Sequence, residues 1–204
     1  MNLAEAQAEF AARGFDYLSP GRMTSMLNDA KNDFEDAWRF PWLEASVIAP
    51  APLSLSDLKL VRYVQDVDRD VELYGIDVAL IAQNGSPLDL PGAPTHWWLQ
   101  GPDPAGVVRM NVWPVAAPNL QVRYVRESPE LALGTDTPLI PARYHGTWLD
   151  LAVVQGYIDS DNFNAAAALR QIANQSLLSI IERYETVNRQ HQRLMSARAP
   201  SEDD

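Results

Sequence analysis

The chain of 204 residues contains no cysteine. This absence excludes disulfide bonds, thiolate zinc sites and cysteine nucleophiles, because each of them needs a sulfhydryl group. Packing within the chain, with or without oligomerisation, is left as the source of stability. The sequence implies no redox chemistry.

Long apolar runs are also absent. The longest, such as residues 78–82, fall far short of the ~20 residues that a membrane-spanning helix needs. The first residues lack the basic and then apolar pattern of a signal peptide. We therefore expect a protein that is cytosolic or is assembled in the cytosol, and that has no membrane partner.

Basic residues are few, with 16 Lys and Arg against 27 Asp and Glu, and the formal net charge is −11. This balance argues against tight binding of nucleic acid, which depends on cations that grip phosphates. It is compatible with a surface past which DNA slides, since like charge lowers adhesion to the phosphate backbone.

The common enzyme signatures are missing: the sequence has no nucleophile elbow, phosphate loop, dinucleotide fingerprint or zinc-protease motif. Carboxylates are abundant, and a pair of them could hydrolyse glycosides, as in a virion-associated enzyme that degrades peptidoglycan. The acidic clusters are Asp33, Glu35 and Asp36, and Asp66, Asp68, Asp70 and Glu72. We interpret both as solvated faces, and the second lacks the central glycine of a calcium loop. No catalytic residue, cofactor or metal ligand is predicted, and a carboxylate-dependent hydrolase is kept as an alternative.

Helical periodicity dominates the N-terminal part. Residues 3–13 are predicted to form a short helix that Gly14 ends, and Ser19 and Pro20 supply an N-cap and a first helical residue for a second helix. Pro41 follows its end. Its apolar stripe comprises Met23, Met26, Leu27, Ala30, Phe34, Ala37 and Trp38.

The middle of the chain is rich in proline, glycine and β-branched residues, which is typical of short strands joined by loops. Candidate strands cover residues 47–48, 58–64, 71–74, 78–82, 95–99, 107–113 and 120–126. The Asn84-Gly85 pair indicates a tight turn. We expect a small sheet or sandwich.

The helical period returns over residues 142–158 and again, past residues 159–161, in a longer helix, and the two are expected to form a hairpin. The stripe of the longer helix comprises Ala166, Leu169, Ala173, Leu177, Ile180, Tyr184 and Val187. The tail has little apolar surface, so we expect it to be mobile unless a partner holds it.

The order of these elements predicts an α+β fold, in which a bundle of N- and C-terminal helices carries a β-rich insertion. The expected helical domain comprises residues 1–44 and 137–190, the insertion residues 45–136, and the flexible tail residues 191–204. No internal repeat is evident.

The junction before the C-terminal hairpin carries most of the candidate site residues. His145 could be a base or a metal ligand, but no other ligand is evident near it, so packing or capping is the simpler interpretation. Tyr144, Trp148 and Tyr157 could anchor a contact between subunits or pack in the core. Glycine weakens a helix, so Gly146 and Gly156 indicate a close approach of neighbouring backbone.

Four features, taken in order, resemble the head-to-tail adaptor proteins of tailed bacteriophages, which are also called connector or head-completion proteins. The first is a helix over residues 23–38 that ends in residues 38–42 (WRFPW), and the second is a strand that ends in residues 111–114 (NVWP) and is followed by residues 122–124 (VRY). The third is residues 138–141 (PLIP) with Tyr144 and His145. The fourth is a helix through Tyr157 that leads past Asp159 into a long amphipathic helix.

This resemblance implies a structural protein of the virion neck, assembled in the host cytoplasm. It implies a ring, of twelve copies, bound to the portal protein on one side and to a stopper or tail protein on the other, with double-stranded DNA passing through without specific binding. The tail, with Arg189, Arg193 and Arg198, would then order on meeting the portal. Another neck component, such as a stopper or tail-completion protein, is kept as an alternative.

Overall fold

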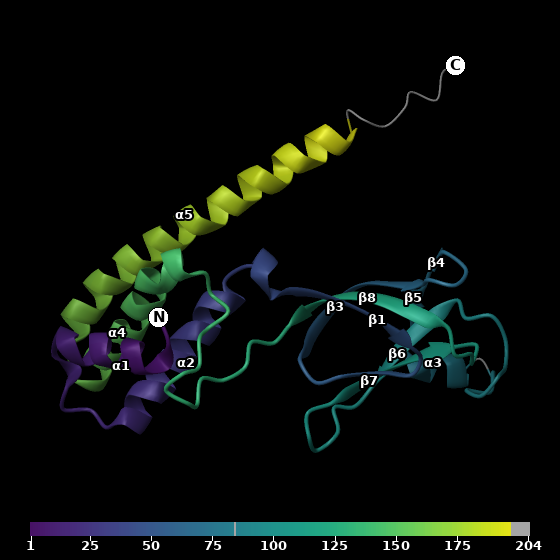
Figure 1. Ribbon diagram of the computed structural model, residues 1–204, viewed down its shortest axis with the longest axis horizontal. Coiled ribbons are helices and arrows are strands. Elements are labelled where there is room, and N and C mark those ends of the chain that lie inside the picture. Colours follow the sequence, from purple (N-terminus) through teal and green to yellow (C-terminus); the bar gives the residue numbers. More distant parts are fainter. Residues whose placement is uncertain (84, 197–204) are drawn as a thin grey trace. The chain divides into compact units, whose positions relative to one another are not determined.

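The computed structural model describes residues 1–83 and 85–196, with side chains through residue 187. The chain forms two compact units (Figure 1). The first, called the helical unit, comprises Met1–Phe40 and Glu130–Asp204, and the second, called the β unit, comprises Pro41–Pro129. Helices at both ends and strands in the middle confirm the α+β prediction.

The helical unit is built around α4, which contacts each of the other long helices of the unit. These helices are α1 (Leu3–Phe10), α2 (Pro20–Asp36), α4 (His145–Asp159) and α5 (Phe163–Ser196). The buried residues of α4 and α2 form the middle of the core and include Leu27, Ala30, Phe34, Trp148, Leu149 and Ala152. Figure 1 shows α5 running along α4 and continuing beyond it.

Local capping explains where the first two helices begin. Asn2 and Glu5 form a capping box at α1, in which each side chain accepts a hydrogen bond of 2.9 Å from the backbone N–H of the other. At α2, Ser19 is the N-cap and Pro20 the first residue, as predicted. α1 ends earlier than expected, and the chain turns through Gly14, whose φ of 101° favours glycine.

The two glycines of α4 lie in different surroundings. A Cβ atom at Gly156 would come within 2.7 Å of the ring of Phe15, which is buried against Phe10 and Tyr157. The expected close approach therefore exists at Gly156, but to a side chain and not to backbone. A Cβ atom at Gly146 would meet nothing within 4 Å, so the prediction was wrong there.

The β unit consists of two four-stranded sheets. One has the order β1-β8-β3-β4 and the other the order β2-β7-β6-β5. Their strands are β1 (Glu44–Pro50), β2 (Leu53–Leu55), β3 (Leu58–Asp66), β4 (Val71–Glu72), β5 (Tyr74–Gly75), β6 (His96–Gln100), β7 (Val108–Trp113) and β8 (Asn119–Arg126). Both sheets contribute to one apolar core, with Val64, Leu120 and Val122 from the first and Met110 and Val112 from the second.

One predicted strand is a helix. Residues 78–82 belong to α3 (Val78–Gln83), where the carboxylate of Asp77 accepts a hydrogen bond of 2.9 Å from the N–H of Ala79. A short apolar run has no period that separates strand from helix. The local cap, together with a burial pattern in which Ile81 is the one buried residue of α3, identifies this segment as a helix. The short strand β2 was not predicted.

The acidic clusters are not uniformly solvated, which corrects the interpretation made from sequence. Asp66 is 1% exposed and accepts hydrogen bonds from the Nε of Arg69 at 2.6 Å and the N–H of Asp68 at 3.0 Å. Asp68 accepts hydrogen bonds from the backbone N–H of Asn119 at 2.9 Å and from its side-chain amide at 3.1 Å, and these two bonds lower the pKa of Asp68. In the other cluster Glu35 is buried. These carboxylates build turns and packing.

The second helix of the predicted C-terminal hairpin is α5, and it is longer than expected, because it extends through Ser196. At ~1.5 Å per residue its 34 residues span about 50 Å. Ala166, Ala173, Leu177 and Ile180 of the predicted stripe are buried, whereas Val187 is exposed. The flexibility expected of residues 191–204 stays a prediction.

We expect Gly156→Ala to lower the free energy of unfolding by about 1–3 kcal/mol, because the new methyl group has no space beside Phe15. Gly146→Ala should raise it by up to about 1 kcal/mol, since the methyl group is unobstructed and alanine favours helix. Urea denaturation followed by circular dichroism measures both. The two variants add the same group to one helix, so equal effects would contradict the proposed clash.

Candidate functional site

The junction singled out from sequence lies at the start of α4. A single helical turn, η3 (Ala142–Tyr144), leads directly into α4. Trp148 of α4 is fully buried, and its Nε1–H donates a hydrogen bond of 2.9 Å to the carbonyl of Leu27. This side chain therefore joins α4 to α2.

His145 is buried against Trp148, with 5.7 Å between the ring centroids. Its Nε2–H donates a hydrogen bond of 2.8 Å to the carbonyl of Ile140. Burial lowers the pKa of His145, as does the charge of the Met1 amino group, while the hydrogen bond to Ile140 and the charge of Glu5 raise it. The net effect lowers the pKa, so the folded chain favours the neutral imidazole.

The two remaining aromatic candidates differ in exposure. Tyr144 is buried, and its hydroxyl donates to that of Tyr184 at 3.5 Å. Tyr157 is half-buried and packs edge to face on Phe15, with 5.2 Å between the ring centroids. Within one chain, Tyr144, His145 and Trp148 thus serve packing and offer little contact area to a partner.

A hollow that the sequence did not reveal lies beside this junction, between the start of α4 and the face of α5. We call it the arginine groove. Its volume is about 260 Å³, and its lining comprises Arg143, Tyr144, Thr147, Ser176, Ser179, Ile180 and Arg183. The α5 residues recur every three or four positions, which places them on one helix face, but only the fold brings Arg143 to that face.

Arg143 is held in place at one side of the arginine groove. Its Nη2 donates a hydrogen bond of 2.8 Å to the hydroxyl of Tyr184, and its guanidinium lies 4.7 Å from the ring centroid of Tyr144. The hydrogen bond to Tyr184 raises the pKa of Arg143. Arg143 therefore stays a positioned cation.

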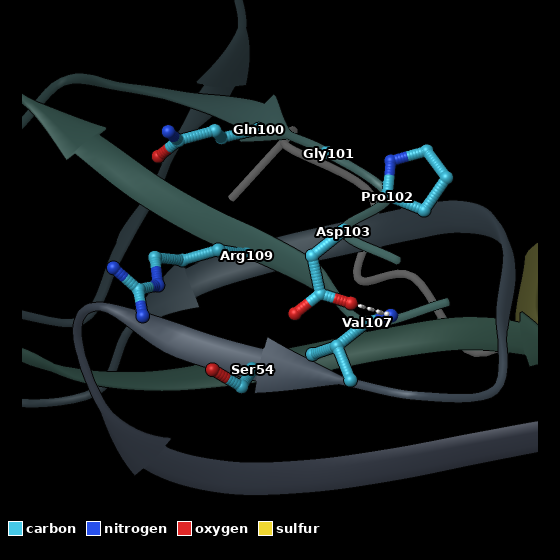
Figure 2. Close-up of a pocket in the computed structure, with 7 residues that line it drawn as sticks. All are labelled: Ser54, Gln100, Gly101, Pro102, Asp103, Val107 and Arg109. Atoms are coloured by element: carbon cyan, nitrogen blue, oxygen red, sulfur yellow. Dashed lines mark hydrogen bonds between the residues drawn. The ribbon is translucent and has the colours of Figure 1, made fainter. Parts of the chain in front are cut away.

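A second hollow, of about 430 Å³, lies on the β unit (Figure 2). Ser54, Arg109 and Gln100 are register partners on β2, β7 and β6, and Figure 2 shows their side chains in a row. Asp103 lies at the edge, where its carboxylate accepts from the N–H of Ala105 and of Val107, both at 2.9 Å. The carboxylate thus shapes its own loop.

A third hollow, of about 500 Å³, lies over β1, β8 and β3. Arg62, Tyr63, Arg123 and Glu44 contribute to its lining. The guanidinium of Arg123 lies 5.8 Å from the ring centroid of Tyr63. Each hollow of the β unit therefore offers arginine beside polar or aromatic groups.

Metal chemistry finds no support in the part of the chain that the structure describes, where no group of three or more His, Asp or Glu side chains could hold an ion. Within the same residues, no helix combines the length and apolar character needed to cross a membrane. Of the predicted tail residues, Arg189 and Arg193 fall within α5 with side chains outside the described set, and Arg198 lies outside the described residues.

Hollows lined by arginine, hydroxyl and aromatic groups on an α+β chain of two units suit contacts with other macromolecules. The family model described as SU10 adaptor protein matches residues 1–200, nearly the whole chain. The chain therefore belongs to the SU10 adaptor protein family, which agrees with its resemblance to phage head-to-tail adaptors. It is a structural phage adaptor. No curated protein matches it.

We expect the helical unit to lose stability as the pH falls from about 6.5 through the lowered pKa of His145. A lowered histidine pKa means that the unfolded chain binds the proton more tightly than the folded chain does. The stability that neutral His145 contributes is therefore fully present above pH ~6.5. Urea denaturation between pH 5.5 and 7.5, followed at 222 nm, measures the slope. His145→Gln should flatten it.

His96→Gln is the matched control, because it makes the same substitution in the β unit and leaves the helical unit unchanged. Asp68, Asp136 and Asp159 have lowered pKa values and lose their contribution only below about 3.8, outside this window. The same slope in His145→Gln as in the unaltered protein would show that His145 does not titrate as described.

Proposed function

We propose that this chain forms a ring, of twelve copies, between the portal protein and the stopper or tail of a phage particle, and that the ring continues the DNA channel. The observation that carries the proposal is the family match over residues 1–200. A match of this length includes both the helical unit and the β unit, so it concerns the whole architecture and not one shared module.

The charge of the chain supports a role beside DNA without binding to it. The formal net charge of −11 opposes adhesion to phosphates, which a channel for packaging and ejection requires. Arginines that line the arginine groove and the hollows of the β unit sit beside carboxyl, hydroxyl and aromatic groups, as expected of protein contacts.

The peptidoglycan hydrolase alternative receives little support from these hollows. Glycoside hydrolysis uses two carboxylates about 5–10 Å apart. Each of the three described hollows contains at most one carboxylate, Asp103 in the hollow of Figure 2 and Glu44 in the third. The carboxylates of the acidic clusters serve turns and packing where they are buried, as Asp66 does.

Mass photometry of the chain mixed with its portal tests the proposal. We expect a ring-sized increase in mass over the portal alone, even if the free chain is a monomer, because the portal can template ring closure. Cross-linking should place the chain directly on the portal, which separates an adaptor from a stopper or tail factor. No added mass under any condition, or a lytic zone on a peptidoglycan gel, would overturn the assignment.

The same assay tests the tail as the segment that meets the portal. The triple variant Arg189→Ala, Arg193→Ala and Arg198→Ala should weaken binding to the portal at least about tenfold, because truncating charged interface groups is costly. Arg170→Ala removes an exposed arginine of α5 outside this segment and is the control. Equal affinities of the triple variant and the control would exclude docking through these arginines.

A further inference from the structure

The arginine groove holds two guanidinium groups without an acidic partner in the described part of the chain. Among the described residues, two tyrosines hold Arg143, through its hydrogen bond to Tyr184 and its position over the ring of Tyr144. Arg183 is exposed and makes no hydrogen bond or ion pair with any described residue. Two such cations side by side form a local positive patch on a chain whose formal net charge is −11.

The rest of the groove fits a carboxylate. Thr147 and Ser176 add hydroxyl groups, which can donate to an anion. The volume of about 260 Å³ is several times the ~30 Å³ that one water occupies, so the groove has room for the carboxylate groups of two acidic side chains. Tyr184 and Tyr144 already fix Arg143, so a ligand would lose little affinity in ordering that guanidinium.

The helical unit also carries a complementary surface. Asp29 and Asp33 are four residues apart on α2, so they share one helix face, and both are exposed. Neither forms an ion pair with a described residue. Arg22 lies within range of the charge of Asp29, but its guanidinium is paired with Asp159. The opposite face of α2 carries Leu27 and Lys31, which are buried in the helical unit, so the aspartates point away from the unit's interior.

We infer that the arginine groove is the acceptor half of a contact between copies, and that it receives the α2 carboxylates, Asp29 and Asp33, of a second copy. A closed ring requires two different patches on each subunit, each meeting the other on a neighbour. The arginine groove and the aspartate face of α2 are two such patches of opposite charge. The inference rests on the proposed ring and names its interface.

Charge reversal in the presence of the portal provides the first test, read by mass photometry. Arg183→Glu should raise the concentration needed for half-maximal ring formation at least about tenfold, and so should Asp33→Arg. A chain carrying both changes should recover much of the loss, because every contact then pairs Glu with Arg. Arg170→Glu, an exposed arginine of the same helix outside the groove, is the matched control and should assemble normally.

Cross-linking provides a direct test, and the absence of native cysteine makes it specific. A chain with Asn32→Cys and Ser179→Cys keeps Asp33 and Arg183. Treated with a short bismaleimide in the presence of the portal, it should give a ladder of covalent oligomers. Asn32→Cys with Arg170→Cys should give no ladder.

The outcomes separate this inference from the proposed function. If the unaltered chain forms no ring on its portal, the proposed function fails. If the ring forms but Arg183→Glu assembles like the control, the groove is not at the interface. If Arg183→Glu blocks assembly but the double charge change does not restore it and no ladder appears, the groove binds something other than α2, and the inference is wrong.

Discussion

The helical unit depends on the burial of α4. This helix carries apolar residues on all sides and is therefore stable only when other helices surround it, as α1, α2 and α5 do. Trp148, in the first turn of α4, is fully buried and hydrogen-bonded to the carbonyl of Leu27 on α2. His145 packs on Trp148, and Gly156 leaves the space that the ring of Phe15 occupies. The junction that looked like a site is thus the centre of the packing.

The enclosure of α4 determines which parts of the helical unit are left to contact other molecules. Because α4 is enclosed, most of the surface of the helical unit comes from the outer faces of α1, α2 and α5 and from the turn before α4. Arg143 lies on that turn and Arg183 on α5, and together they concentrate positive charge on an acidic chain. The β unit has its own core and its own hollows, so each unit can present a separate contact surface.

Much of the fold could be predicted from the sequence because its signals are local. The stripe of α2, the cap at Ser19 and the β-branched strands each follow from a few neighbouring residues. The prediction failed for residues 78–82, where a short apolar run carries no period and the cap at Asp77 was overlooked. It failed also for Glu35 and Asp66, because the burial of a carboxylate depends on groups that only the fold assembles.

The sequence by itself determined the α+β class, the family resemblance, the acidity and the absence of cysteine chemistry, since composition, periodicity and motif order are properties of the chain. Only the tertiary structure decided the positions of the candidate residues. It buried Tyr144, His145 and Trp148, and it brought Arg143 beside Arg183, 40 positions further along. Proximity between residues so distant in sequence arises from the packing of α4 and α5, and no local pattern encodes it.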